Sequence, residues 1–129
     1  MQKAFLTVTL IFNFIILSGQ IIFENDLLVM ENEVSRHSIS FKKGKIIPVS
    51  VFSKENNSEI LASDKGAPWF EFIINNQKIT SSDPVWRVRH HETRKLNNGG
   101  SEIKIIVSAP GRISGLELEI YRQIFPNST

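Results

Sequence analysis

Apolar and polar side chains alternate along most of this chain with a period of two, which is the spacing of β-strands and not of helices. The pattern is clearest in Ser101–Ser108, where Ile103, Ile105 and Val107 would share one face. Turn-forming residues separate the alternating runs, and no stretch has a convincing helical period. The sequence therefore predicts an all-β fold, an antiparallel β-sandwich. Its other strands are expected at residues 26–30, 34–41, 46–52, 69–74, 77–80, 85–89 and 115–125, with brief pairing at 59–62.

The densest aromatic cluster, residues 68–86, has the pattern of a hairpin followed by a corner. Asn75 and Asn76 tolerate the left-handed backbone of a two-residue turn, so they predict a hairpin that returns through residues 77–80. Pro84 has no N–H to donate and keeps Asp83 out of the helical region, which predicts a corner after the second strand.

Further breaks are expected at glycine and proline. Gly44, in the charged stretch 42–45, is free to adopt a positive φ. Pro48 lies inside a predicted strand and removes one ladder donor, so it predicts an edge strand or a β-bulge. Residues 90–96 are polar and are expected to form a loop that leads to an Asn-Asn-Gly-Gly turn at 97–100.

The first nineteen residues differ in character from the rest and predict a signal peptide helix. Lys3 supplies a positive start, residues 4–17 are mostly apolar, and Ser18 and Gly19 are small residues near a plausible cleavage point. The apolar run is short for a membrane span of about twenty residues, so no stable span is expected after cleavage. An uncleaved signal anchor is the alternative, because residues 21–23 are also apolar. We expect an exported protein, periplasmic or extracellular in a bacterium, with residues 20–129 as one β-sandwich domain.

Charge and cysteine content narrow the function classes. The chain has 15 Lys and Arg against 13 Asp and Glu, a formal charge of +2, and its basic residues form only short runs. Nucleic-acid binding is not expected, because it usually needs clustered Lys and Arg. The chain has no cysteine, which excludes disulfides, thiolate metal sites and a cysteine nucleophile.

The polar residues that resemble catalytic groups have simpler interpretations. His90 and His91 are adjacent, so on a strand they would point to opposite faces and could not readily share a metal ion. Glu117 and Glu119 would share one strand face, where a solvent-exposed pair is favoured over the carboxylates of a glycosidase. The sequence has no nucleophile elbow and no phosphate-binding loop. No catalytic, cofactor-binding or metal-binding residue is predicted.

Trp69 and Trp86 are the candidates for a ligand contact or a domain interface. Exposed tryptophans stack on sugar rings and anchor interfaces, whereas buried ones fill cores. Each of the two stands close to the end of a predicted strand. Packing in the core or at a domain interface is favoured, and direct contact with a carbohydrate is the alternative.

Four stretches of the chain together resemble the N-terminal β-sandwich of secreted bacterial alpha-galactosidases of the melibiase type. They are residues 30–52, residues 68–86, the Asn-Asn-Gly-Gly turn and residues 101–129. The matching motifs are a PW-F-F strand at Pro68–Phe72, a DPVW corner at 83–86 and the Gly115–Pro126 strand. The resemblance implies a partial, galactose-mutarotase-like supersandwich that is incomplete at its C-terminus. It also implies a partner, a catalytic (β/α)₈ barrel, to which no residue of this chain corresponds.

The expected function is therefore that of a non-catalytic β-sandwich fragment of an exported glycoside hydrolase of the alpha-galactosidase kind. Its role would be to pack against the barrel and shape the rim of the substrate pocket. Two alternatives remain. A stand-alone carbohydrate-binding module would change its tryptophan fluorescence on adding galactosides, whereas an envelope or adhesion β-domain would pair edge to edge and ignore sugars.

Overall fold

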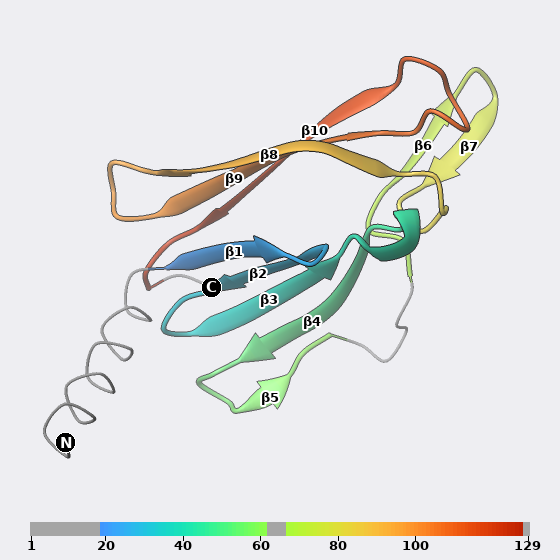
Figure 1. The fold of residues 1–129 in the computed structure, drawn as a ribbon. Coiled ribbons are helices and arrows are strands. Elements are labelled where there is room, and N and C mark those ends of the chain that lie inside the picture. Colours follow the sequence, from blue (N-terminus) through green and yellow to red (C-terminus); the bar gives the residue numbers. More distant parts are fainter. Residues whose placement is uncertain (1–18, 62–66, 128–129) are drawn as a thin grey trace, which may run out of the picture.

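The computed structural model describes residues 19–61 and 67–127, which form two antiparallel sheets packed face to face with a small hairpin at one end (Figure 1). The larger sheet is a meander whose strands pair in chain order. The fold class is therefore the predicted one, an all-β antiparallel sandwich. Residues 1–18, most of the predicted signal peptide, lie outside the described residues. The strands of the larger sheet are β1 (Gln20–Glu24), β2 (Leu27–Glu31), β3 (Ser35–Ser40), β4 (Ile47–Ser53) and β5 (Ser58–Glu59).

The second sheet contains three strands, with β9 (Ser101–Ser108) between β8 (Arg87–Lys95) and β10 (Glu117–Ile124). The end hairpin consists of β6 (Glu71–Ile74) and β7 (Gln77–Thr80). A single 3-10 turn, η1, precedes β4 at Lys42–Gly44. In the part of the chain that the structure describes, no helix is long and apolar enough to cross a membrane.

The core lies between the two sheets and draws side chains from both. Ile103, Ile105 and Val107 of β9 are fully buried, as their alternation predicts. Each buried aliphatic side chain of this size contributes about 1.5–3 kcal/mol relative to an exposed one. The larger sheet and the connections contribute Leu28, Met30, Ile39, Phe41, Ile46, Trp86 and Ala109. The end hairpin adds Ile79 from β7, and β10 adds Ile124.

Two hairpins are closed by the same kind of two-residue turn. Asn75 and Asn76 have φ of 51° and 61° between β6 and β7, which confirms the predicted turn. Asn25 and Asp26 have φ of 52° and 58° between β1 and β2. Positive φ at both central residues is the turn whose twist matches that of paired strands. The second of these turns was not predicted.

The predicted effects of Gly44 and Pro48 are confirmed. Gly44 has a φ of 72°, and a Cβ there would lie 3.0 Å from the carbonyl carbon of Pro84. Along β4, Ser50 pairs with Ser38 and Pro48 pairs with Ile39, so one extra residue is accommodated between these pairs. That shift is the β-bulge that the missing N–H of proline favours.

Several predicted boundaries were wrong. The first strand is β1 and not residues 26–30, because residues 21–23 pair with β2. Val85 and Trp86 precede β8, whereas the polar stretch expected as a loop after residue 89 forms most of that strand. Residues 87–95 are exposed except for Val88, so β8 has no buried alternation from which it could be recognised.

Candidate functional site

The register of the second sheet aligns polar side chains on its outer face, the face that points away from the core. Across the strands, Glu92 of β8 pairs with Lys104 of β9, which pairs with Tyr121 of β10. Residues directly opposite on neighbouring strands have close Cβ atoms, so these three form one row. The alternation that buries the three apolar residues of β9 places this row on the solvent side.

A second row is held together by hydrogen bonds. Glu102 of β9 accepts from Arg94 Nε at 2.7 Å and from Gln123 Nε2 at 2.6 Å. The Glu102 side chain is 7% exposed although it lies on the outer face, because its two neighbours cover it. The hydrogen bonds from Gln123 and from Arg94 lower the pKa of Glu102, so this carboxylate stays charged to a lower pH than an ordinary glutamate does.

Tyr121 is the aromatic residue of this face and is 52% exposed. Its hydroxyl donates to Glu119 Oε2 at 2.7 Å, and Lys104 Nζ lies 3.2 Å from Glu119 Oε1 and 5.8 Å from the centre of the tyrosine ring. The hydrogen bond to Glu119 raises the pKa of Tyr121, and the hydrogen bonds from Tyr121 and Lys104 lower that of Glu119. These contacts fix the orientation of the ring.

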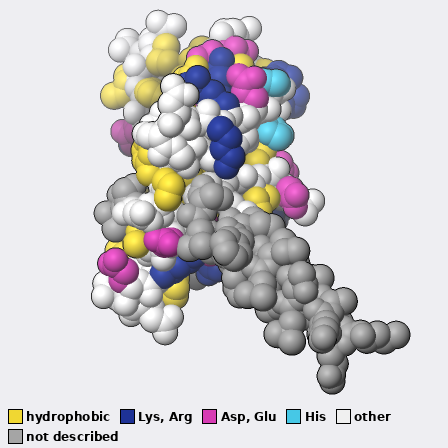
Figure 2. Space-filling model, turned by 90° about the vertical axis from the view of Figure 1, so that its left-hand side faces the viewer, with side chains coloured by type: hydrophobic (Ala, Val, Ile, Leu, Met, Phe, Trp, Pro, Cys, Tyr) yellow, Lys and Arg dark blue, Asp and Glu magenta, His cyan; other side chains and the backbone are white. Residues whose placement is uncertain are grey.

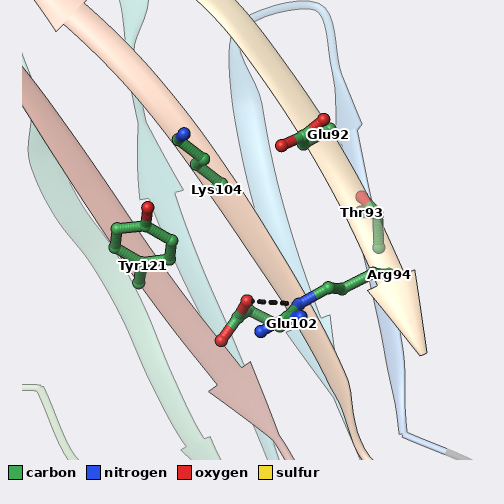
Figure 3. Close-up of a pocket in the computed structure, with 6 residues that line it drawn as sticks. All are labelled: Glu92, Thr93, Arg94, Glu102, Lys104 and Tyr121. Carbon is green, nitrogen blue, oxygen red and sulfur yellow. Dashed lines mark hydrogen bonds and ion pairs between the residues drawn. The ribbon is translucent and has the colours of Figure 1, made fainter. Parts of the chain in front are cut away.

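Both rows border a shallow pocket of about 390 Å³, which we call the outer-face pocket (Figure 3). Figure 2 shows Lys, Arg, Asp, Glu and His side chains grouped on the layer that holds this sheet. The pocket offers the exposed carboxylate of Glu92, the cationic groups of Arg94 and Lys104, and the exposed side chain of Tyr121. Both oxygens of Glu102 already accept hydrogen bonds. Its residues are Glu92, Thr93, Arg94, Glu102, Lys104 and Tyr121.

This arrangement suits binding better than acid–base chemistry. A general acid that works near neutral pH needs a carboxyl group with a raised pKa. Glu102 and the neighbouring Glu119 have lowered pKa values instead, and each is held by a cation. Glu117 and Glu119 share the exposed face of β10, as the sequence predicts.

The structure separates the two predicted tryptophan candidates. Trp86 is 4% exposed, packs edge-on against Phe70 and donates from Nε1 to the Thr80 carbonyl at 2.9 Å. It is a core residue and has no accessible face for a ligand. Trp69 is half-buried beside Phe70, and the Arg122 guanidinium lies 5.3 Å from the centre of its ring. The two indoles therefore do not form a joint sugar platform.

The adjacent histidines lie on opposite sides of β8. His90 Nε2 is 3.6 Å from Glu92 on the outer face, whereas the ring of His91 packs edge-on against Phe23 of β1. Among residues 19–61 and 67–127, no group of three or more His, Asp or Glu residues could hold a metal ion.

Sequence reasoning did not find the outer-face pocket. Its residues come from three strands and are ordinary polar residues in each, so the pocket exists only once the register is known. Tyr121, the single tyrosine of the chain and placed among charged residues on a predicted strand, was the available signal. Comparison of the chain with protein-family models, with curated proteins and with solved structures finds no match, so its kinship to alpha-galactosidases stays a prediction from motifs.

Proposed function

We propose that this chain is a non-catalytic β-sandwich that binds carbohydrate in the outer-face pocket. The observation that carries the proposal is the exposed ring of Tyr121, oriented by Glu119 and standing beside a row of charged side chains. A sugar ring has an apolar face of C–H groups and an edge of hydroxyls. The tyrosine ring suits the first, and the carboxylate and cationic groups suit the second.

The shape of the pocket supports a short, exposed ligand. It is shallow and lies on the face of a sheet, so a sugar would lie along the strands instead of being enclosed. The fixed pairs around Glu102 and Glu119 hold their groups in place before binding, which lowers the entropic cost of ordering them. The motifs shared with alpha-galactosidases favour galactosides among the sugars to test first.

The test is calorimetric titration of the full chain with melibiose, raffinose and galactose. Wild-type protein should bind at least one of them. Tyr121→Ala should abolish binding, Tyr121→Phe should keep most of it, and Ile73→Ala should leave it unchanged, because Ile73 is 72% exposed on a different strand. Absence of binding to all three sugars by folded wild-type protein would refute the proposal for galactosides.

The second candidate function is packing against the catalytic barrel of such a glycosidase. The observation that favours it is the β6–β7 hairpin, which forms a separate sheet at one end of the sandwich and exposes Ile73 (Figure 1). The half-buried Trp69 immediately precedes this hairpin. A purified melibiase-type barrel should bind the wild-type chain and not Ile73→Asp. Equal retention of the two proteins on the immobilised barrel would exclude this role for the hairpin.

In both roles we propose that the protein acts after export. Export is supported by the sequence of residues 1–19, which has the pattern of a signal peptide. Residues 1–18 lie outside the described part of the structure. N-terminal sequencing of the protein from the culture medium or periplasm should begin near Gln20. Recovery of the chain with Met1 intact in the membrane fraction would instead indicate an uncleaved anchor.

A further inference from the structure

Arg122 points into the sandwich and not away from it. Along β10, exposed and less exposed residues alternate, and Arg122 falls on the same face as Leu118, Ile120 and Ile124. The last of these is a core residue. An arginine at such a position brings a permanent positive charge to the space between the two sheets.

This guanidinium is poorly satisfied within the described residues. Its Nε is buried and has no hydrogen-bond partner there, and the guanidinium lies over the face of the Trp69 ring. Burial lowers the pKa of Arg122, which means that the charged form is not fully compensated by its surroundings. By contrast, Arg94 on the outer face of the same sheet has a carboxylate partner.

A cavity of about 320 Å³ that is open to solvent lies beside Arg122, between β10 and the larger sheet. His37 of β3 lines it from the opposite sheet, and Ser35 lies two residues earlier on the same face of that strand. Apolar surface from Met30, Ile124 and Phe125 completes much of the wall. We call this space the Arg122 cavity.

We propose that the Arg122 cavity binds a small monocarboxylate that has an apolar body. A guanidinium is a planar fork that matches a carboxylate with two parallel hydrogen bonds, and the terminal nitrogens of Arg122 are not among the buried atoms. The apolar wall suits a short hydrocarbon or an aromatic ring. The volume is at the lower end of the range for ligand pockets, which favours a small molecule.

His37 supplies an independent readout. Burial and then the charge of Arg122 lower the pKa of His37, and the other residues that line the cavity are uncharged. A bound carboxylate would offset the Arg122 charge and favour protonated His37, so the pKa of His37 should rise on binding. By linkage, the same ligand should bind more tightly as the pH falls through this pKa.

The test uses benzoate and butyrate as probes, with benzamide as a neutral analogue of the same shape as benzoate. Benzoate should bind the full chain, and benzamide should bind at least tenfold more weakly. Arg122→Met keeps an unbranched side chain without the charge and should weaken benzoate binding by roughly 10- to 100-fold. Arg36→Gln is the matched control, because Arg36 lies on the other face of β3 against Phe52 and should leave binding unchanged.

Titration of His37 by NMR should show a higher pKa in saturating benzoate than in benzamide. Equal affinity for benzoate and benzamide, or unchanged benzoate binding by a folded Arg122→Met protein, would overturn the proposal. So would the absence of binding of both carboxylates to the wild type. The outer-face pocket is not involved, so Tyr121→Ala should bind benzoate normally even where it has lost sugar binding.

Discussion

Replacing Trp86 tests the conclusion that this indole is part of the core. The ring is 4% exposed and packs against Phe70 at a centroid distance of 5.4 Å. Its Nε1 donates to the carbonyl of Thr80, which also accepts a hydrogen bond from the Asp83 N–H. We compare Trp86→Ala, which removes both packing and hydrogen bond, with Trp86→Phe, which removes the hydrogen bond and part of the ring.

The structure sets the expected magnitudes. Truncating a buried tryptophan to alanine costs about 3–5 kcal/mol of unfolding free energy, because the surrounding core collapses only partly. In Trp86→Phe, the lost hydrogen bond contributes about 0.5–1.5 kcal/mol, and Thr80 keeps its second donor. Because the phenyl ring also fills less of the core, we expect Trp86→Phe to lose about 1–3 kcal/mol of unfolding free energy in total. A domain of this size has about 5–15 kcal/mol of unfolding free energy in all, so Trp86→Ala should remove a large fraction of its stability.

Urea unfolding followed by far-ultraviolet circular dichroism measures these losses without relying on tryptophan fluorescence. Trp69→Ala is the comparison, and it should lose about 1–2 kcal/mol, because Trp69 is only half-buried. A Trp86→Ala protein within 1 kcal/mol of the wild type would refute the placement of this side chain in the core. A larger loss for Trp69→Ala than for Trp86→Ala would contradict the assigned difference in burial.

Three further predictions concern single contacts. Asn32→Ala should lose about 2–4 kcal/mol of unfolding free energy, measured in urea. The reason is that this fully buried amide donates to the Phe125 carbonyl and its oxygen accepts from two backbone N–H groups. An unchanged unfolding free energy would contradict those bonds. Asp26→Gly should stabilise the protein by up to about 1 kcal/mol, because glycine adopts φ of 58° without strain, and Asp26→Ala should destabilise it. The pKa of Glu102 is lower in the folded protein than in the unfolded one, so its carboxylate stabilises the fold above the unfolded pKa. This stabilisation is lost as the pH falls through the folded pKa. Glu102→Gln should therefore lose less unfolding free energy in acid than the wild type does.

The elements that sequence reasoning found were those with a local cause. Asn75 and Asn76 prefer the backbone that their turn requires, and Pro48 lacks the N–H that a regular ladder would use. Alternation located β9 because that strand has one buried face. It failed for β8, where side chains on both faces are exposed, and polar residues there have the composition of a loop.

The candidate sites depend on contacts that single strands do not reveal. Glu102 and Gln123 meet only because β9 and β10 pair in one particular register. Trp86 and Trp69 have similar neighbours in the sequence. The structure distinguishes them, because Trp86 is buried and donates a hydrogen bond to the Thr80 carbonyl, whereas Trp69 is half-buried. The inward position of Arg122 could have been inferred, since it continues the alternation of β10, but the cavity beside it requires the second sheet.

The link between Asn32 and Phe125 has a consequence for the order of assembly. It joins residues 93 positions apart, and the Glu33 N–H bonds to the Pro126 carbonyl beside it. Closing a loop of that length costs about 4 kcal/mol of chain entropy, whereas each hairpin of the β1–β5 meander closes over a few residues. We expect the meander to form first during folding, and the sandwich to close only when the chain after β10 reaches Asn32. In pulsed hydrogen exchange during refolding, amides in β2 and β3 should gain protection before that of Glu33; simultaneous protection would show that the two ends of the chain assemble in one step.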